Sequence, residues 1–122
     1  MSRVALQKWR QDWKEGASKA SWPCQQGFDH YYGSLEGLNS FFEPNQLVAD
    51  NTILNTEEWP DDYYLTDDLT DRAVSQILSL RSANPHKPFF TYFAHVAVHA
   101  PLQAPADVLE EQRGKYAADG TR

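Results

Sequence analysis

The segment 89–96 restricts the fold of this chain more than any other, because it is almost entirely apolar and follows residues that break helices. Asn84, Pro85 and Pro88 end any helix that precedes it, since proline lacks a backbone N–H and disfavours helical geometry in the residue before it. An apolar run of this length between helix breakers is too short for a helix. The sequence therefore predicts a strand, Phe89–Val96, buried on both faces of a sheet.

A helix is predicted immediately before these breakers, over Thr66–Ala83. Thr66 is the expected N-cap, and acidic residues crowd the first turns, where the helix dipole favours them. The apolar residues at helical spacing are Leu69, Ala73, Val74, Ile77, Leu78 and Leu80. A helix that leads into a buried strand is typical of an α/β fold, so we expect part of an α/β sheet flanked by helices. Pro105–Gln112 predicts a further short helix ended by Gly114.

The N-terminal half is punctuated by glycine and proline, which indicates a long irregular stretch. We interpret residues 1–122 as one partial domain, with 1–62 mostly irregular and 63–122 in the order helix, strand, loop, helix. The segment Val4–Trp13 is compatible with the end of a strand or with a helical face. If Val4–Trp9 is a strand, it should lie parallel to Phe89–Val96, as a neighbour or near-neighbour, through a right-handed crossover. The aromatic pair Phe41–Phe42 is expected to anchor the irregular stretch to a core.

Composition excludes two classes of partner. The net charge of −6, with no cluster of lysine and arginine, argues against nucleic-acid binding. No apolar run approaches the roughly 20 residues that a membrane helix needs, and the first ten residues do not form a signal peptide. The single cysteine, Cys24, does not decide the redox compartment, so the localisation stays unknown.

Two histidines follow the predicted strand and are the best candidates for a site, because ligands gather beyond the carboxyl ends of strands in open α/β sheets. We expect His95 to be held at the strand end by the core, with a backbone carbonyl as its partner, and His99 to lie on an open loop. Their spacing also resembles a zinc motif, but Val96 stands where the general-base glutamate would be, and Pro101 disfavours a helix.

Other candidate groups have simpler explanations. Cys24 has no basic neighbour in sequence that would activate it, so it is interpreted as an ordinary loop thiol. The acidic residues at the predicted helix start need no metal, and the basic residues near the N-terminus are typical of a solvated face. These two groups are Asp67, Asp68 and Asp71, and Lys8, Arg10, Lys14 and Lys19.

Four segments, taken in order, resemble the sulfatase family of the arylsulfatase type. They are Gly27-Phe28-Asp29-His30-Tyr31-Tyr32-Gly33, the helix entry Tyr63–Ala73, the strand and His-Ala-Pro loop over Pro88–Pro105, and Arg113-Gly114-Lys115-Tyr116. Each is short, but their order makes the resemblance specific, and together they span most of the chain. The resemblance implies a partial sulfatase-type α/β sheet and hydrolysis of sulfuric esters by a full-length parent.

The resemblance also implies roles for individual residues. His99, before Ala100-Pro101, matches the sulfate-site histidine, which contacts the ester oxygen and serves as general acid. Lys8 matches a sulfate-binding lysine, although Gln7 and Arg10 replace the glycine and histidine that surround it in the family. A formylglycine, matured from a Cys/Ser-x-Pro/Ala-x-Arg motif, and a calcium ion are implied for the full-length parent, and none is expected within this chain.

The chain is therefore expected to be an internal fragment of a sulfatase that supplies part of the sulfate pocket and is inactive alone. Two alternatives remain open: a non-catalytic, sulfatase-derived binding module, and a phosphate or phosphonate ester hydrolase of the same alkaline-phosphatase-like superfamily. The expected ligand is a sulfate ester or a sulfated glycan. An incomplete sheet leaves edges and apolar faces uncovered, so self-association is also expected.

Overall fold

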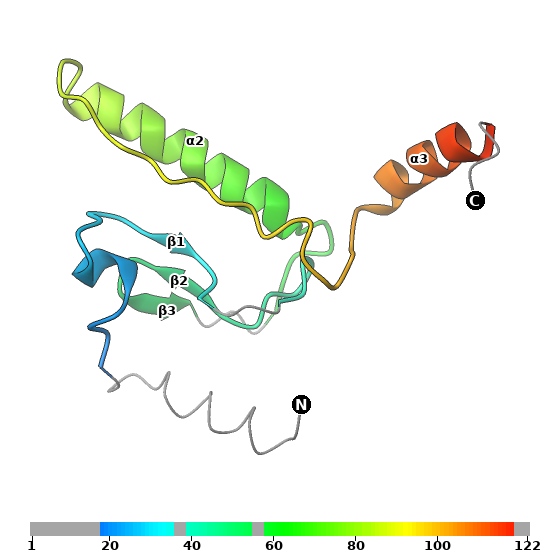
Figure 1. Cartoon of the computed structure of the whole chain (residues 1–122), viewed down its shortest axis with the longest axis horizontal. Coiled ribbons are helices and arrows are strands. Elements are labelled where there is room, and N and C mark those ends of the chain that lie inside the picture. Colours follow the sequence, from blue (N-terminus) through cyan, green and yellow to red (C-terminus); the bar gives the residue numbers. More distant parts are fainter. Residues whose placement is uncertain (1–17, 36–38, 55–57, 119–122) are drawn as a thin grey trace. The chain divides into compact units, whose positions relative to one another are not determined.

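The computed structural model describes residues 18–35, 39–54 and 58–118, and these form two compact units that are considered separately. The first unit takes its described residues from 18–35 and 46–54, and the second from 39–45 and 58–118. The first contains a 3-10 helix, Pro23–Gln25, and the strands β1 (Tyr32–Gly33), β2 (Leu47–Ala49) and β3 (Thr52–Leu54). The second contains the helices α2 (Leu65–Ala83) and α3 (Ala106–Ala118) (Figure 1).

The first unit is a small antiparallel sheet in the order β1-β2-β3. Its register pairs Gly33 with Val48, and Val48 with Ile53 on the other side. The central strand β2 is the most buried, because it has a neighbour on each side and contributes Leu47 and Val48 to the core beside Trp22. The stretch predicted to be irregular therefore contains short strands.

Asp50 organises the two-residue turn between β2 and β3. Its backbone has φ of 54°, a left-handed geometry that aspartate tolerates better than most residues. Its N–H donates to the Tyr31 carbonyl at 2.7 Å, and its carboxylate accepts the Tyr31 N–H at 3.0 Å. The hairpin turn is thus tied to the residue that precedes β1.

Gly27, in the same unit, has φ of 99°, a backbone geometry that residues with an L side chain rarely adopt.

Helix α2 confirms the predicted helix to within one residue, and its first turn contains Asp67 and Asp68 as expected. The predicted N-cap is wrong: the helix begins one residue earlier, with Tyr64 as N-cap, and the Thr66 hydroxyl is buried without a hydrogen-bond partner among the described residues. Capping comes instead from another segment, because the Leu65 N–H donates to the Phe41 carbonyl at 2.7 Å.

The core of the second unit lies at the start of α2. Leu65 and Leu69 are buried there together with Phe41, which is 2% exposed, so the anchoring role expected for Phe41 is confirmed. Further along α2 the apolar stripe emerges into solvent, and Leu78 is 62% exposed. The predicted stripe is correct in its spacing, but within the described residues only its first turns are fully covered.

The prediction of a doubly buried strand at Phe89–Val96 is wrong for this chain. After the turn at 84–87 these residues run extended from the end of α2 back toward the level of its first turn (Figure 1), and no strand of the described residues pairs with them. Their large side chains are exposed, Phe90 by 77%. The physical reason is that a strand requires a partner, and no described segment supplies one on either edge or covers either face. The proposed parallel neighbour, Val4–Trp9, lies outside the described residues.

Helix α3 begins where the sequence predicts, directly after Pro105, and its first hydrogen bond joins the Leu109 N–H to the Pro105 carbonyl at 3.1 Å. It continues through Gly114, so the predicted end there is wrong. One glycine costs a helix only about 1 kcal/mol, which neighbouring helix formers offset. The expectation of an α/β chain is confirmed, with a three-stranded antiparallel sheet and two α-helices in the part of the chain that the structure describes. None of the described helices is long and apolar enough to cross a membrane.

The burial pattern of α2 predicts unequal effects for two leucines. Leu69→Ala should lower the free energy of unfolding of the second unit by about 2–5 kcal/mol, because it opens a cavity in the core. Leu78→Ala, on the exposed part of the same helix, should lower it by about 0.5 kcal/mol or less. Urea denaturation followed by far-UV circular dichroism measures both changes. Equal effects would contradict the position of the core at the first turns of α2.

Candidate functional site

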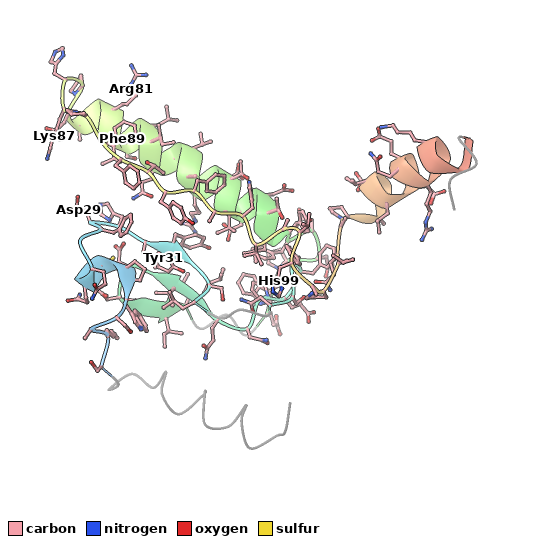
Figure 2. The ribbon with its side chains drawn as sticks, in the orientation of Figure 1. Asp29, Tyr31, Arg81, Lys87, Phe89 and His99 are labelled. Carbon is pink, nitrogen blue, oxygen red and sulfur yellow. The ribbon has the colours of Figure 1, made fainter. Side chains whose placement is uncertain are left out.

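The candidate site is the loop 97–103, which joins the extended segment to the approach to α3. A turn begins it, in which the His99 N–H donates to the Val96 carbonyl at 2.9 Å. Peptide bonds Ala97–Val98 and Ala100–Pro101 are cis. Figure 2 shows Lys87 and Phe89 at one end of the extended segment and His99 at the other. His99 is therefore an exposed loop residue just beyond the end of the extended segment, as predicted.

The ring of His99 is held by its own loop. Its Nδ1 lies 2.7 Å from the Ala100 carbonyl oxygen, and a carbonyl only accepts hydrogen bonds, so Nδ1 carries the hydrogen. The other nitrogen, Nε2, has no hydrogen-bond partner among residues 18–35, 39–54 and 58–118. Fixing one ring nitrogen determines the role left for the second. Nε2 therefore accepts when the ring is neutral and donates when the ring is protonated.

Gln103 attaches the far end of the loop to the core of the second unit. Its side-chain Oε1 accepts the Phe41 N–H at 2.8 Å, and its carbonyl accepts the Tyr64 hydroxyl at 3.2 Å. The Tyr64 ring packs against Phe42, with ring centroids 5.5 Å apart. Three segments far apart in sequence, around residues 41, 64 and 103, thus meet beside the first turn of α2.

His95 does not occupy the predicted environment. It is exposed, and its ring meets the edge of Phe93 at a centroid distance of 4.4 Å instead of bonding to a backbone carbonyl. The prediction assigned the carbonyl partner to the wrong histidine, because it assumed that a covering layer surrounds the end of the strand. His95 and His99 also differ in their contacts, since of the two rings only that of His99 hydrogen-bonds to a backbone carbonyl of the described residues.

Sequence reasoning missed Gln103, Phe41 and Tyr64 as a connected group. Hydrophobic periodicity carries no information on a hydrogen bond between residues 62 positions apart. One signal was available: Gln103 is a polar residue between Pro101 and Pro105, directly after the candidate loop histidine. Lys8, the predicted sulfate-binding cation, lies outside the described residues.

A second polar cluster lies in the first unit around Asp50. Its Oδ1 is 3.4 Å from Nδ1 of His30 and 3.9 Å from Sγ of Cys24. Burial raises the pKa of the Cys24 thiol, and the negative charge of Asp50 raises it further. A thiol with a raised pKa is a poor nucleophile, which agrees with the interpretation of Cys24 as an ordinary loop thiol. Burial likewise raises the pKa of the nearby Tyr31 to about 12, and its hydroxyl donates to the Ser34 carbonyl.

Comparison with known proteins adds an independent finding. A family model described as Sulfatase matches residues 2–122. Arylsulfatase J of Mus musculus is 36% identical over 99 residues, which cover 75% of this chain and 16% of that protein. An arylsulfatase of Klebsiella aerogenes is 27% identical over 115 residues, which cover 85% of this chain and 24% of that protein. The chain thus spans between about a sixth and a quarter of the length of these relatives.

The cofactors of such proteins have no evident place on the described residues. No three histidine, cysteine, aspartate or glutamate side chains there are grouped so that they hold a metal ion, so the described carboxylates do not fit calcium. Cys24 is followed by Gln25-Gln26-Gly27, which is not the motif from which formylglycine matures.

The environment of Cys24 predicts a specific change in its reactivity. Asp50→Asn removes a negative charge, keeps an oxygen for the Tyr31 N–H and tolerates the left-handed backbone, so the pKa of the Cys24 thiol should fall. Alkylation by iodoacetamide near neutral pH should then become faster, because the thiolate is the reactive form. The matched control is Asp107→Asn on α3, in the other unit. An unchanged rate in Asp50→Asn would mean that Asp50 does not act on the thiol.

Proposed function

Because this chain belongs to the sulfatase family, we propose that it supplies part of the sulfate-binding pocket of a sulfuric ester hydrolase, with His99 in contact with the ester. The observation that carries the proposal is the exposed His99 ring, held through Nδ1 and with Nε2 directed to no described partner. Lys8 is proposed as a second sulfate-binding residue. Residues 1–122 would then be one part of a larger sulfatase domain.

The geometry of His99 fits the role of a general acid. In the protonated ring, Nδ1–H remains bonded to the Ala100 carbonyl while Nε2–H points to the bridging oxygen of the ester. As the sulfur–oxygen bond breaks, its electron pair stays on the leaving oxygen, which takes the Nε2 proton and departs as an alcohol. The ring becomes neutral, and its fixed orientation leaves Nε2 ready to be protonated again.

The nucleophile and the calcium ion of the reaction are not assigned to this chain. No Cys/Ser-x-Pro/Ala-x-Arg motif occurs within the 122 residues, so these residues alone are proposed to bind sulfate esters, small or part of a glycan, without turning them over. In a longer polypeptide that contains the motif, the formylglycine hydrate would supply the attack on sulfur. The same absence favours the second candidate function, a non-catalytic module that recognises sulfated ligands.

A comparison of histidine variants tests the proposal. In a longer polypeptide that contains this chain and the nucleophile motif, His99→Ala should lower kcat on a chromogenic aryl sulfate by about 10²–10⁴-fold, the usual effect of losing a general acid. His95→Ala, the matched control on the exposed segment, should leave kcat near the wild-type value. Equal losses of kcat in the two variants would mean that the proposal separates the roles of His99 and His95 wrongly. Full activity in His99→Ala would refute His99 as the general acid.

The isolated 122-residue chain provides the complementary measurement. It should not hydrolyse the same aryl sulfate, even with added calcium. Turnover that copurifies with the chain and is lost in His99→Ala would contradict the proposed inactivity. Faster hydrolysis of a phosphate or phosphonate ester than of a sulfate ester by the longer polypeptide would favour the other branch of the superfamily.

Self-association of the isolated chain is proposed from the extended segment. No backbone hydrogen bond joins residues 91–95 to the rest of the described chain, and Phe89, Phe90, Tyr92 and Phe93 are exposed. Unpaired backbone beside exposed aromatic rings is a template for pairing with the same segment of a second copy. Such pairing buries the rings and satisfies the backbone groups together.

Light scattering across a dilution series measures this association. The wild-type chain should be a dimer or larger, and Tyr92→Lys should raise its dissociation constant by about tenfold or more, because a charge at a sheet edge opposes pairing. Val108→Lys, on the exposed face of α3, is the matched control and should have little effect. A compact monomer at every concentration would refute the proposal.

A further inference from the structure

The loop that carries His99 is attached to the core of the second unit by one polar side chain. The Oε1 of Gln103 accepts the Phe41 N–H at 2.8 Å, and Phe41 is almost fully buried. A buried N–H that loses its acceptor is costly, so this bond strongly favours one position of Gln103. The carbonyl of the same residue accepts the Tyr64 hydroxyl, which adds a second attachment.

The surroundings of this attachment are rigid. Phe41 also accepts the Leu65 N–H at 2.7 Å, so both of its backbone polar groups are used, one by α2 and one by Gln103. Leu65 is 1% exposed and begins a helix of 19 residues. Phe41 therefore connects Gln103 directly to the first turn of α2, and Phe41 itself is buried.

His99 is close enough in sequence for this attachment to determine its position. Only three residues separate it from Gln103, and four residue steps span at most about 14 Å. Leu102 is 84% exposed, so its side chain buries little surface that would hold the loop in place. On the other side, the extended segment 91–95 makes no backbone hydrogen bond with the described chain. Among the described residues, Gln103 is thus the nearest residue to His99 that hydrogen-bonds to the core.

We propose that Gln103 is the positioning residue for His99: its bond to the Phe41 N–H holds the loop so that the His99 ring keeps Nδ1 on the Ala100 carbonyl and Nε2 toward the ligand. The inference rests on the proposed function for the identity of the ligand, a sulfate group, but not for the orientation of the ring. Gln103 touches no reacting atom and acts only through the loop.

The test uses the whole 122-residue chain and variants that separate shape from hydrogen bonding. Gln103→Met keeps the length of the side chain and removes the acceptor oxygen, whereas Gln103→Glu restores an acceptor. Heteronuclear NMR of the ring nitrogens, at a pH where the ring is neutral, reports which nitrogen carries the hydrogen. The wild-type chain and Gln103→Glu should show His99 with hydrogen on Nδ1, and Gln103→Met should show a mixture of both tautomers.

Controls distinguish positioning from unfolding. Far-UV circular dichroism should show that Gln103→Met retains α2, and Gln112→Met, the same substitution on α3, should leave the His99 ring signals unchanged. Tyr64→Phe removes the second attachment but keeps the ring packing, and should shift the tautomer balance in the same direction by less. Should Gln103→Met shift the Phe41 amide signal but leave the His99 ring as in the wild type, the proposal is overturned.

Titration with inorganic sulfate tests the link to function. The wild-type His99 ring signals should shift saturably with sulfate, and Gln103→Met should weaken the apparent affinity by about three- to tenfold, the effect of losing one neutral hydrogen bond. If the wild-type His99 ring signals do not shift on addition of sulfate, the proposed function is contradicted. The tautomer measurement would still decide the role of Gln103. Unchanged sulfate affinity together with an unchanged tautomer in Gln103→Met would refute the positioning role.

Discussion

The backbone of Phe41 is the constraint on which the second unit depends. Its carbonyl accepts the first N–H of α2, and its N–H is accepted by Gln103, so one buried residue both starts the helix and holds the loop after the extended segment. Side-chain capping is absent at this helix, with Tyr64 at the N-cap position. The position of the helix start is therefore determined by a tertiary contact. The segment 39–45 stabilises it through the Phe41 carbonyl, in addition to the sequence of the helix itself.

The segment 89–96 has the amino-acid composition of a buried strand, but it does not form a strand in this structure. Its aromatic residues carry the pattern of a doubly covered strand, but strand geometry is stabilised by neighbours on both edges and layers on both faces. The relatives that this chain matches are about four to six times longer than the aligned segment, judged by the 24% and 16% of their lengths that it covers. The segment is extended in this chain without a partner strand, which leaves its aromatic rings in water.

Local signals in the sequence predicted the local elements well. The spacing of Leu69, Ile77 and Leu80 and the prolines after them located α2, and Pro105 located the start of α3. The sequence correctly predicted that His99 lies on a loop, but it predicted the wrong surroundings for His95. Whether His95 is buried depends on other segments of the chain, and the pattern of residues within 89–96 carries no information about them. The connection from Phe41 to Gln103 was also beyond sequence reasoning, since it joins two irregular segments by one hydrogen bond.

The separation of 62 residues between Phe41 and Gln103 has a consequence for the order in which the second unit is completed. During synthesis Phe41 and the whole of α2 are made before Gln103, so Gln103 is the last of the three to emerge from the ribosome and the Phe41 N–H gains its acceptor last. Closing a segment of this length costs chain entropy that local helix formation does not. The contact that fixes the His99 loop is therefore expected to form after the start of α2, as a separate and later step in the folding of this unit.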